Sequence, residues 1–203
     1  MLYMYGSVCI TVEQGGGRIP AVVRTTKARW IEAGLEALAE GGPDAVRVEQ
    51  LAVRLGVTKG GFYGCFAGRT ALLAELLDEW ERRSTRDVIA QTTAEDVDAA
   101  ERIRRAGQLT SSEALHRIDL AVRTWARHDE SVAARLRRID NERMDFLRTM
   151  FATFVDDPDE VEARSTLMFA LAIGRQFIAA DHPDHSKREI VQLAAEYVLR
   201  PLT

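Results

Sequence analysis

Residues 46–77 read VRVEQLAVRLGVTKGGFYGCFAGRTALLAELL, and this stretch decides the fold. Apolar residues at helical spacing mark one face of a first short helix: Val48, Leu51, Ala52 and Leu55. Gly56 is typical of the end of that helix, because glycine adopts the left-handed conformation without a Cβ clash. Thr58 stands where a hydroxyl caps the start of a second helix. The spacing therefore predicts a helix-turn-helix, whose second helix is free to enter the major groove of DNA.

The same stretch resembles a known family. Residues 56–66, GVTKGGFYGCF, are similar to the GVSKGTLYxHF core of TetR-type transcriptional regulators, most closely to a variant reading SKGGFYWHF. The similarity extends back to residues 27–31, which look like the family's first helix, and forward to residues 69–80, which look like its linking helix. Residues 125–129, WARHD, followed by Arg143, are similar to a common pattern of its regulatory domain. The resemblance implies an all-α protein with an N-terminal three-helix DNA-binding domain and a C-terminal helical bundle.

The whole chain of 203 residues is patterned as successive helices. We expect a flexible leader at residues 1–22, a helix-turn-helix DNA-binding domain at 23–70 and a ligand-binding and dimerisation domain at 71–203. Outside the motif, apolar periodicity predicts helices near residues 25–40, 69–86, 129–155 and 158–180, one that starts near Thr110, and one that starts at Ser186. Residues 87–108 are weakly periodic, so the limits of any helix there stay open.

Three of these helix starts carry capping residues. Thr110 and Glu113 have the spacing of a capping box, in which each side chain satisfies a backbone N–H group near the other. Ser186 and Glu189 have the same spacing at the last helix. Residues 157–158, Asp-Pro, predict a cap followed by a proline in the first helical position, where its missing N–H costs nothing.

Composition is that of an ordinary globular protein with an uneven charge. Residues 18–72 contain eight Lys/Arg and five Asp/Glu, whereas residues 73–203 contain nineteen and twenty-five. A basic head on an acidic body suits a protein that approaches phosphates with one end. Cys9 and Cys65 give neither a disulfide framework nor a zinc signature, so we expect a reduced, cytoplasmic setting. No apolar run reaches the roughly eighteen residues of a membrane span, and the first residues lack a signal-peptide pattern.

Seven residues in and around the motif are candidate contacts to double-stranded DNA: Arg47, Thr58, Lys59, Gly60, Gly61, Tyr63 and Arg69. A long cation at the start of the recognition helix reaches a phosphate or a guanine edge, and a tyrosine offers both a hydroxyl and a ring. Two glycines cost about 1 kcal/mol each in a helix interior, and close approach of the sugar-phosphate chain would explain them. The alternatives are a solvated lysine, a tolerant first turn and a ring packed on the domain. Phe62 and Phe66 are assigned to the domain's core.

The motif departs from the family pattern at three positions. Cys65 stands where the family usually has histidine, and Gly64 stands where a large aromatic residue is common. Arg69 follows at about the place where the family usually has lysine. These departures predict weaker DNA binding and a recognition helix that DNA itself orders. The thiol is either a small apolar residue, which is the default, or an oxidation switch at the DNA face.

The C-terminal helices supply candidates for an effector site and for a homodimer interface. Side chains that would line a largely apolar pocket are Trp125, Arg143, Phe146, Met150, Met168, Arg175 and Phe177. The alternative for Arg143 is an internal ion pair with Asp140, Asp145 or Glu142, or a solvated face. Helices that are apolar on several faces must be covered on several faces, which predicts a dimer seam. Candidates for that seam are Phe169, Ile173, Leu193 and Tyr197, and the core of a monomer is the alternative.

Together these patterns predict a ligand-responsive transcriptional repressor that binds an inverted-repeat operator as a homodimer. A small amphipathic or apolar molecule would release it from DNA. No cofactor, metal or enzymatic activity is expected. The best metal-binding candidate is residues 181–185, DHPDH, in an interhelical connection where a solvated loop is the simpler interpretation. The alternatives are a dimeric helical regulator that has lost DNA binding and acts through protein contacts, and a small helical metal-dependent enzyme.

Overall fold

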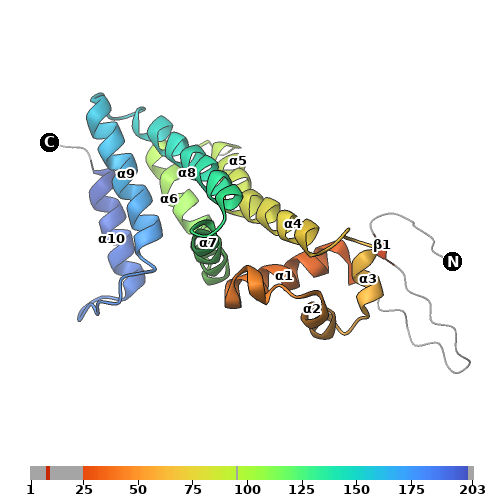
Figure 1. Ribbon diagram of the computed structural model, residues 1–203. Helices are drawn as coiled ribbons and strands as arrows, with labels where there is room; N and C mark the ends of the chain where they lie inside the picture. The colour runs from red at the N-terminus through yellow and green to blue at the C-terminus, as the bar shows by residue number, and fades with distance from the viewer. Residues whose placement is uncertain (1–7, 10–24, 95, 201–203) are drawn as a thin grey trace, which may run out of the picture. The chain divides into compact units, whose positions relative to one another are not determined.

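The structure is all-α, as predicted, apart from one short strand pair (Figure 1). The computed structural model describes residues 8–9, 25–94 and 96–200. Its α-helices are α1 (Lys27–Gly41), α2 (Val48–Leu55), α3 (Lys59–Tyr63), α4 (Arg69–Glu81), α5 (Asp87–Ala94), α6 (Ala99–Leu109), α7 (Glu113–Ala126), α8 (Glu130–Phe151), α9 (Pro158–Gly174) and α10 (Lys187–Leu199). A 3₁₀ turn, η1 (Pro43–Ala45), precedes α2, and a π-helical segment, η2 (Arg82–Arg86), directly follows α4. Strands β1 (Val8–Cys9) and β2 (Thr25–Thr26) pair antiparallel, and the rest of the predicted leader lies outside the described residues.

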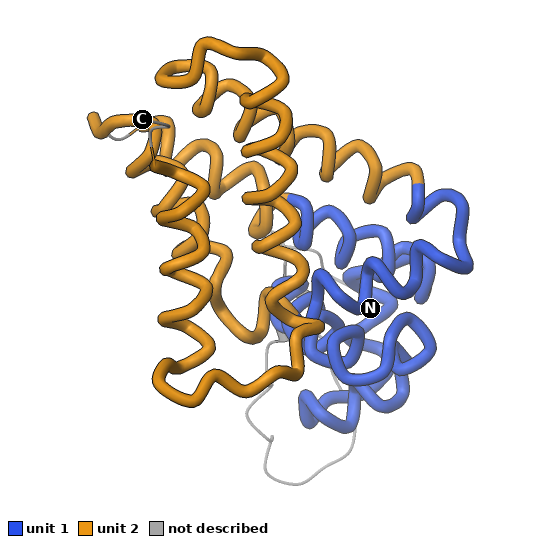
Figure 2. Tube along the Cα trace, turned by 90° about the vertical axis from the view of Figure 1, so that its left-hand side faces the viewer, with its two compact units in different colours: residues 1–81, 117–133 blue, residues 82–116, 134–203 orange. Residues whose placement is uncertain are grey.

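The chain forms two compact units, which Figure 2 shows in blue and orange. Unit 1 takes the described residues of 1–81 and 117–133, and unit 2 takes those of 82–116 and 134–203. Helix α4 therefore belongs to unit 1 up to its last residue, and α7 contributes only its first turn to unit 2. Within unit 1, α4 packs against α1.

The core of unit 1 is built on one face of α4. Leu72, Leu76 and Trp80 recur every four residues on this helix and are fully buried. Helix α1 packs so closely that a Cβ added to Gly34 would lie 2.9 Å from the Leu76 side chain. This close approach explains a glycine in the middle of α1, where it costs about 1 kcal/mol relative to alanine.

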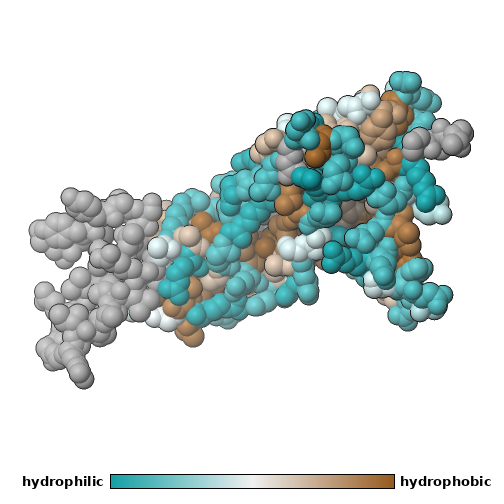
Figure 3. Space-filling model, turned by 180° about the vertical axis from the view of Figure 1, so that it is seen from behind, coloured by the Kyte–Doolittle hydropathy of each residue, from teal (hydrophilic) through white to brown (hydrophobic). Residues whose placement is uncertain are grey.

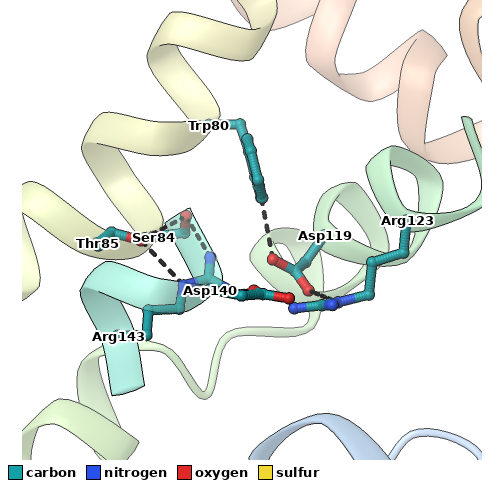
Figure 4. Close-up of polar contacts among 7 residues, drawn as sticks. All are labelled: Trp80, Ser84, Thr85, Asp119, Arg123, Asp140 and Arg143. Atoms are coloured by element: carbon teal, nitrogen blue, oxygen red, sulfur yellow. Dashed lines mark hydrogen bonds and ion pairs between the residues drawn. The ribbon is translucent and has the colours of Figure 1, made fainter. Parts of the chain in front are cut away.

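A buried polar chain joins α4 to α7 inside unit 1 (Figure 4). The ring N–H of Trp80 donates to Asp119 Oδ1 over 3.0 Å, and Arg123 Nε donates to Asp119 Oδ2 over 2.8 Å. Asp119 is buried, and a buried carboxylate is tolerated only when charge and hydrogen bonds compensate it. These two donors therefore satisfy the carboxylate and hold α7 against α4.

The core of unit 2 gathers side chains from α6, α8, α9 and α10. Its buried members are Ile103, Leu147, Met150, Phe151, Met168 and Leu199. Helices α9 and α10 run antiparallel, since Arg164 in the first half of α9 donates to the Val198 carbonyl at the end of α10 over 2.8 Å. Arg164 also lies 2.5 Å from Glu160, so that this buried cation has an acidic partner.

Three predicted helix ends are confirmed. Gly56 lies in the left-handed region after α2. The Asp157 side chain accepts from a backbone N–H at the start of α9. Ser186 and Glu189 form the full capping box at the start of α10.

The predicted capping box at Thr110 is wrong. Thr110 ends α6 instead, and its hydroxyl donates to the Ala106 carbonyl over 2.8 Å. The start of α7 is capped two residues later, where Ser112 Oγ accepts from the Leu115 N–H over 3.3 Å. A threonine whose hydroxyl serves the preceding helix cannot also cap the next one.

Candidate functional site

The first candidate surface is the helix-turn-helix of unit 1, formed by α2 and α3. Gly56 closes α2 at φ 67° and ψ 34°, and its N–H bonds back to the carbonyls of Ala52 and Val53. Thr58 then precedes α3 with extended backbone, at φ −85° and ψ 156°. The side-chain cap predicted for Thr58 is absent, because its hydroxyl accepts no bond from α3. Thr58 is exposed, so its hydroxyl does not stabilise α3.

One buried ring fixes which residues of α3 face outward. Phe62 is fully buried, with its ring centroid 5.3 Å from that of Trp30 and 5.2 Å from that of Phe66. The prediction that Phe62 and Phe66 belong to the core is thus confirmed. Lys59, Gly60 and Tyr63 are exposed, and Tyr63 keeps 62% of its surface in solvent. The helix presents a cation, bare backbone and a phenol, which are groups suited to phosphates and base edges.

Gly61 has no packing reason to be a glycine. A Cβ added there would meet no atom within 4 Å, and its φ is not positive. Since glycine costs about 1 kcal/mol relative to alanine inside a helix, the residue weakens α3 without an internal benefit. Gly61 is itself buried, but the open space at its Cβ position favours the interpretation in which another molecule's backbone approaches α3 there.

A carboxylate of α2 holds the cation at the start of α3. Lys59 Nζ lies 2.5 Å from Glu49 Oε1, and 54% and 62% of these two side chains are exposed. The hydrogen bond from Lys59 is the main cause that lowers the pKa of Glu49. Exposed pairs of this kind contribute little to stability, so a phosphate can replace Glu49 at small cost. Glu49 belongs to the site although no motif in the sequence singled it out.

Both arginines of the predicted DNA-contact set bind loop carbonyls. Arg47 Nε donates to the Asp44 carbonyl over 3.0 Å. Arg69 Nε donates to the Val46 carbonyl over 2.7 Å, and one of its terminal nitrogens donates to the Pro43 carbonyl. Arg69 therefore ties the start of α4 to the loop that positions α2.

Cys65 has neither the small apolar thiol nor the reduced state expected from the sequence. The residue is disulfide-bonded and half-buried just after α3. Gly64, where an aromatic residue is common in the family, follows α3 with ordinary right-handed backbone at φ −75° and ψ −20°. Nothing in this backbone conformation requires a glycine there.

The second candidate site is a cavity of about 810 Å³ within unit 2. Its walls come from α6, the start of α7, α9 and α10. Apolar side chains on these walls include Met168, Leu171, Val191 and Leu199. A cavity of this volume and lining suits a small organic molecule.

Arg175 directly follows α9, and its side chain lines this cavity. One terminal nitrogen of its guanidinium lies against the ring of His116, at the start of α7. Its Nε is buried without a hydrogen-bond partner among the described residues. Burial lowers the pKa of Arg175, because the charged form loses its hydration.

The predicted effector-binding residues divide among several environments. Met168 and Arg175 line the cavity. Phe146 and Met150 pack in the core of unit 2, and Phe177 is 67% exposed beyond α9. His116, which no sequence pattern singled out, reaches the cavity because α7 begins beside α9.

Arg143, another predicted effector contact, holds the π-helical segment η2 (Figure 4). Its Nε donates to Thr85 Oγ1 over 2.9 Å, and one terminal nitrogen donates to Ser84 Oγ over 2.7 Å. Its other terminal nitrogen lies 3.5 Å from Asp140, which is one of the ion-pair alternatives considered from the sequence. Trp125 is half-buried in the part of α7 that belongs to unit 1.

A third candidate surface is the apolar face that α9, α10 and the residues just after α9 leave exposed, here called the α9–α10 face. Its large apolar side chains and their exposures are Leu167 (57%), Phe177 (67%), Ile178 (48%), Leu193 (44%) and Tyr197 (68%). Figure 3 shows apolar surface over this pair of helices, on the right of the view. Of the predicted interface residues, Leu193 and Tyr197 lie on this face, Ile173 is half-buried, and Phe169 packs on the core of unit 2.

Residues 181–185, the metal-binding candidate, lie in the loop before α10 and are mostly exposed. Within the residues that the structure describes, no group of three or more His, Cys, Asp or Glu side chains could hold a metal ion. Across those same residues, no helix has both the length and the apolarity to cross a membrane.

Residues 31–76, from α1 to most of α4, match the model for bacterial regulatory proteins of the tetR family. A transcriptional regulator from Rhodococcus sp. Rha1 has the same fold, with 21% identity and a TM-score of 0.66 over 86% of this chain and 94% of that one. FadR from Bacillus subtilis, solved with stearoyl-CoA, is 15% identical, with a TM-score of 0.62 over 87% and 99% of the two chains. AibR, solved with isovaleryl coenzyme A and operator DNA, is 12% identical, with a TM-score of 0.63 over 87% and 99%. No curated protein is detectably similar to this chain in sequence.

Proposed function

Because residues 31–76 match the model of the tetR family, we propose that this chain is a TetR-family transcriptional regulator, and specifically a ligand-responsive repressor that binds an inverted-repeat operator as a homodimer. The resemblance carried by residues 56–66 is confirmed by the same match. The outward face of α3 is the observation on which the proposal rests. In this proposal the protein acts in the cytoplasm and has no enzymatic role.

The residues exposed by α3 are assigned to DNA by their chemistry. Lys59 contacts a phosphate or a guanine edge, and Tyr63 donates its hydroxyl to a phosphate. The backbone at residues 60–61 lies against the sugar-phosphate chain, where a side chain would intervene. Thr58 and Arg47 contact neighbouring phosphates, and Arg69 combines its loop contacts with a phosphate contact. AibR, which has the same fold, was solved with operator DNA.

Two copies of the chain meet through the α9–α10 face. Side chains such as Leu193 and Tyr197, which one copy leaves exposed, become buried in a seam of two helices from each copy. Burial of apolar surface contributes about 25 cal/mol per Å², and obligate homodimer interfaces bury roughly 2,000 Å² or more. A two-fold axis then presents two α3 helices to the two halves of an inverted repeat.

The effector occupies the cavity of unit 2. FadR was solved with stearoyl-CoA and AibR with isovaleryl coenzyme A, so small organic ligands are bound by proteins of this fold. The ligand releases DNA only if it binds better to the dimer whose α3 helices do not match successive major grooves. A tenfold loss of operator affinity requires about 1.4 kcal/mol of coupling between the two sites.

Binding of the purified protein to fragments of its own genome tests the proposal. Lys59→Ala with Tyr63→Phe should abolish binding to the retained fragments, whereas Arg138→Ala, which removes an exposed cation of α8, should not. If Lys59 contacts a phosphate, Lys59→Ala alone should reduce the log–log salt slope by about one unit. Full affinity in the double variant would contradict the placement of α3. Failure of a folded wild-type dimer to retain any fragment would favour a regulator that acts through protein contacts.

A further inference from the structure

The cavity of unit 2 has cations at one end. Since α9 and α10 run antiparallel, Arg175 after α9 and residues 187–188, Lys-Arg, at the start of α10 belong to the same end of the helix pair. Lys187 Nζ donates to the Ile178 carbonyl, just beyond α9, over 2.8 Å, so the two helix ends are adjacent. Three basic side chains therefore line this end of the cavity.

The opposite end of the cavity carries core apolar side chains beside the Arg104–Glu196 ion pair. Met168 lies two helical turns before Arg175, and Leu199 lies at the far end of α10. Both line the cavity and belong to the hydrophobic core of unit 2. Leu171 and Val191 line the wall between the two ends. An apolar wall thus leads from the cations to the core.

The acidic residue in the cavity lining is already paired. Glu196 accepts from Arg104 Nε at Oε1 over 2.7 Å and from a terminal nitrogen at Oε2 over 3.0 Å. A bidentate pair of this kind satisfies both groups. The charges of Arg104 and Glu196 therefore cancel, and the remaining cations give the lining a net positive charge.

Arg175 lacks an acidic partner in the described part of the chain. Its contact is with the ring of His116, its buried Nε has no hydrogen-bond partner there, and loss of hydration is what lowers its pKa. Arg175 is half-buried, and a cation partly removed from water without a counter-charge destabilises the folded chain. An anion that enters the cavity would supply the missing charge.

We propose that the effector is an organic anion with an apolar tail, whose head group pairs with Arg175 beside His116. The tail lies along Leu171 and Val191 toward Met168. The regulatory role of this anion rests on the proposed function, whereas its binding to the cavity does not depend on it. A carboxylate of a fatty or aryl acid and the phosphates of an acyl-coenzyme A thioester share this chemistry, and the experiment separates them.

Isothermal titration calorimetry on the full chain tests the site with four probes: decanoate, decanoyl-coenzyme A, 1-decanol and inorganic phosphate. We expect decanoate or decanoyl-coenzyme A to bind, and the one that binds identifies the source of the anion. Arg175→Gln should weaken that binding by about tenfold or more, which corresponds to about 1.4 kcal/mol. The matched control is Arg148→Gln, because this cation of α8 pairs with Glu162 and does not line the cavity. Arg148→Gln should leave the affinity for the anion unchanged. The affinity for 1-decanol should be lower than that for the anion and should change in neither variant.

Thermal unfolding gives a second readout that does not depend on a ligand. Arg175→Gln removes an uncompensated cation, so it should raise the melting temperature of the unliganded protein, whereas Arg148→Gln should not. Binding of neither anion at millimolar concentration, or equal binding of decanoate to wild type and Arg175→Gln, would overturn the inference. Operator affinity without ligand separates the two proposals. Intact operator binding without anion binding overturns this one alone, and the reverse result overturns the repressor alone.

Discussion

At the scale of single residues, Gly61 is a position where stability and the proposed function favour different residues. Stability favours alanine, and DNA binding favours glycine. Alanine would fit at this position, since an added Cβ meets no atom within 4 Å. The folded chain therefore gains nothing from the glycine. The missing side chain leaves the space of one methyl group, which a DNA backbone lying against α3 could occupy.

Gly61→Ala should therefore stabilise the protein and weaken operator binding at the same time. The free energy of unfolding should rise by up to about 1 kcal/mol in urea denaturation. Operator affinity, measured by fluorescence anisotropy, should fall. The control is Gly107→Ala in α6, where an added Cβ also meets no atom within 4 Å. It should stabilise the chain with operator affinity unchanged, and an unchanged affinity in Gly61→Ala as well would remove DNA as the reason for this glycine.

Which residues could be placed from the sequence depends on the distance along the chain to their partners. The burial of Phe62 and the turn at Gly56 follow from spacing within a dozen residues, and both were predicted correctly. Arg69 and Arg143 bind groups 23 and 58 residues away. Periodicity carries no information about such partners, so the loop contacts of Arg69 and the η2 contacts of Arg143 could not be foreseen.

At the scale of elements, η2 is the segment where α4 stops following the ordinary helical repeat. Ser84 and Thr85 are buried there, and both hydroxyls accept a hydrogen bond from Arg143 of α8. A π-helical turn is rare and is often found at functional sites. It follows directly on α4, the end of the first segment of unit 1, and is the first segment of unit 2 in chain order.

Arg143→Met should destabilise unit 2, because it removes the donor that two buried hydroxyls share and leaves only their long contact with each other, at 3.4 Å. Each buried group left unsatisfied costs about 1–3 kcal/mol. Urea denaturation should show a loss in this range or above. Arg138→Met, which breaks an exposed pair with Glu142, is the control and should cost less than about 1 kcal/mol. Equal losses in the two variants would mean that Arg143 does not hold η2.

The Arg104–Glu196 pair between α6 and α10 should give a pH-dependent contribution to stability. The hydrogen bond from Arg104 lowers the pKa of Glu196 below its ordinary 4.5 in the folded chain. Its contribution is therefore present above that ordinary value and is lost as pH falls through the lowered one. Glu196→Gln should cost less than about 1 kcal/mol near neutral pH, because the pair is partly exposed. The difference from wild type should shrink on acidification, and a difference that grows would contradict the assignment.

Most elements could be predicted from apolar periodicity, but several of their limits could not. The predicted helix at 69–86 changes to a π-helical segment after Glu81, and the one at 158–180 ends at Gly174. Apolar side chains continue past Gly174 at Phe177 and Ile178, and neither glycine nor proline stands just after Glu81, so the sequence does not mark where the backbone departs from the α-helix. Capping residues predict a helix boundary better than apolar periodicity does where the side chain can hydrogen-bond to only one helix, as at Ser186.

At the scale of the whole molecule, the α9–α10 face is the surface that a second copy should cover. Wild-type protein should be a dimer at micromolar concentration by light scattering. Leu193→Asp should give monomer or insoluble protein, because it places a charge in an apolar seam. Val53→Asp is the control, since Val53 is 82% exposed on α2 of unit 1. A wild-type monomer, or a dimer that survives Leu193→Asp unchanged, would reject this face as the interface.

The order of elements and the helix-turn-helix could be predicted at this scale, whereas contacts between distant segments could not. Helix α7 contributes to both units, and its buried contact with Trp80 joins segments 39 residues apart. The cavity likewise draws on four helices, so that a histidine from α7 and a cation after α9 meet only in the folded chain.

The number of protein copies on an operator tests the central claim most directly. The operator is the inverted repeat recovered from genomic fragments, and the comparison is the same duplex with one half scrambled. Sedimentation should show two copies on the intact duplex, and anisotropy should show a loss of affinity of about a hundredfold or more on the scrambled one, because only one α3 then finds its half-site. One copy on the intact duplex, or equal affinity for both duplexes, would contradict the account.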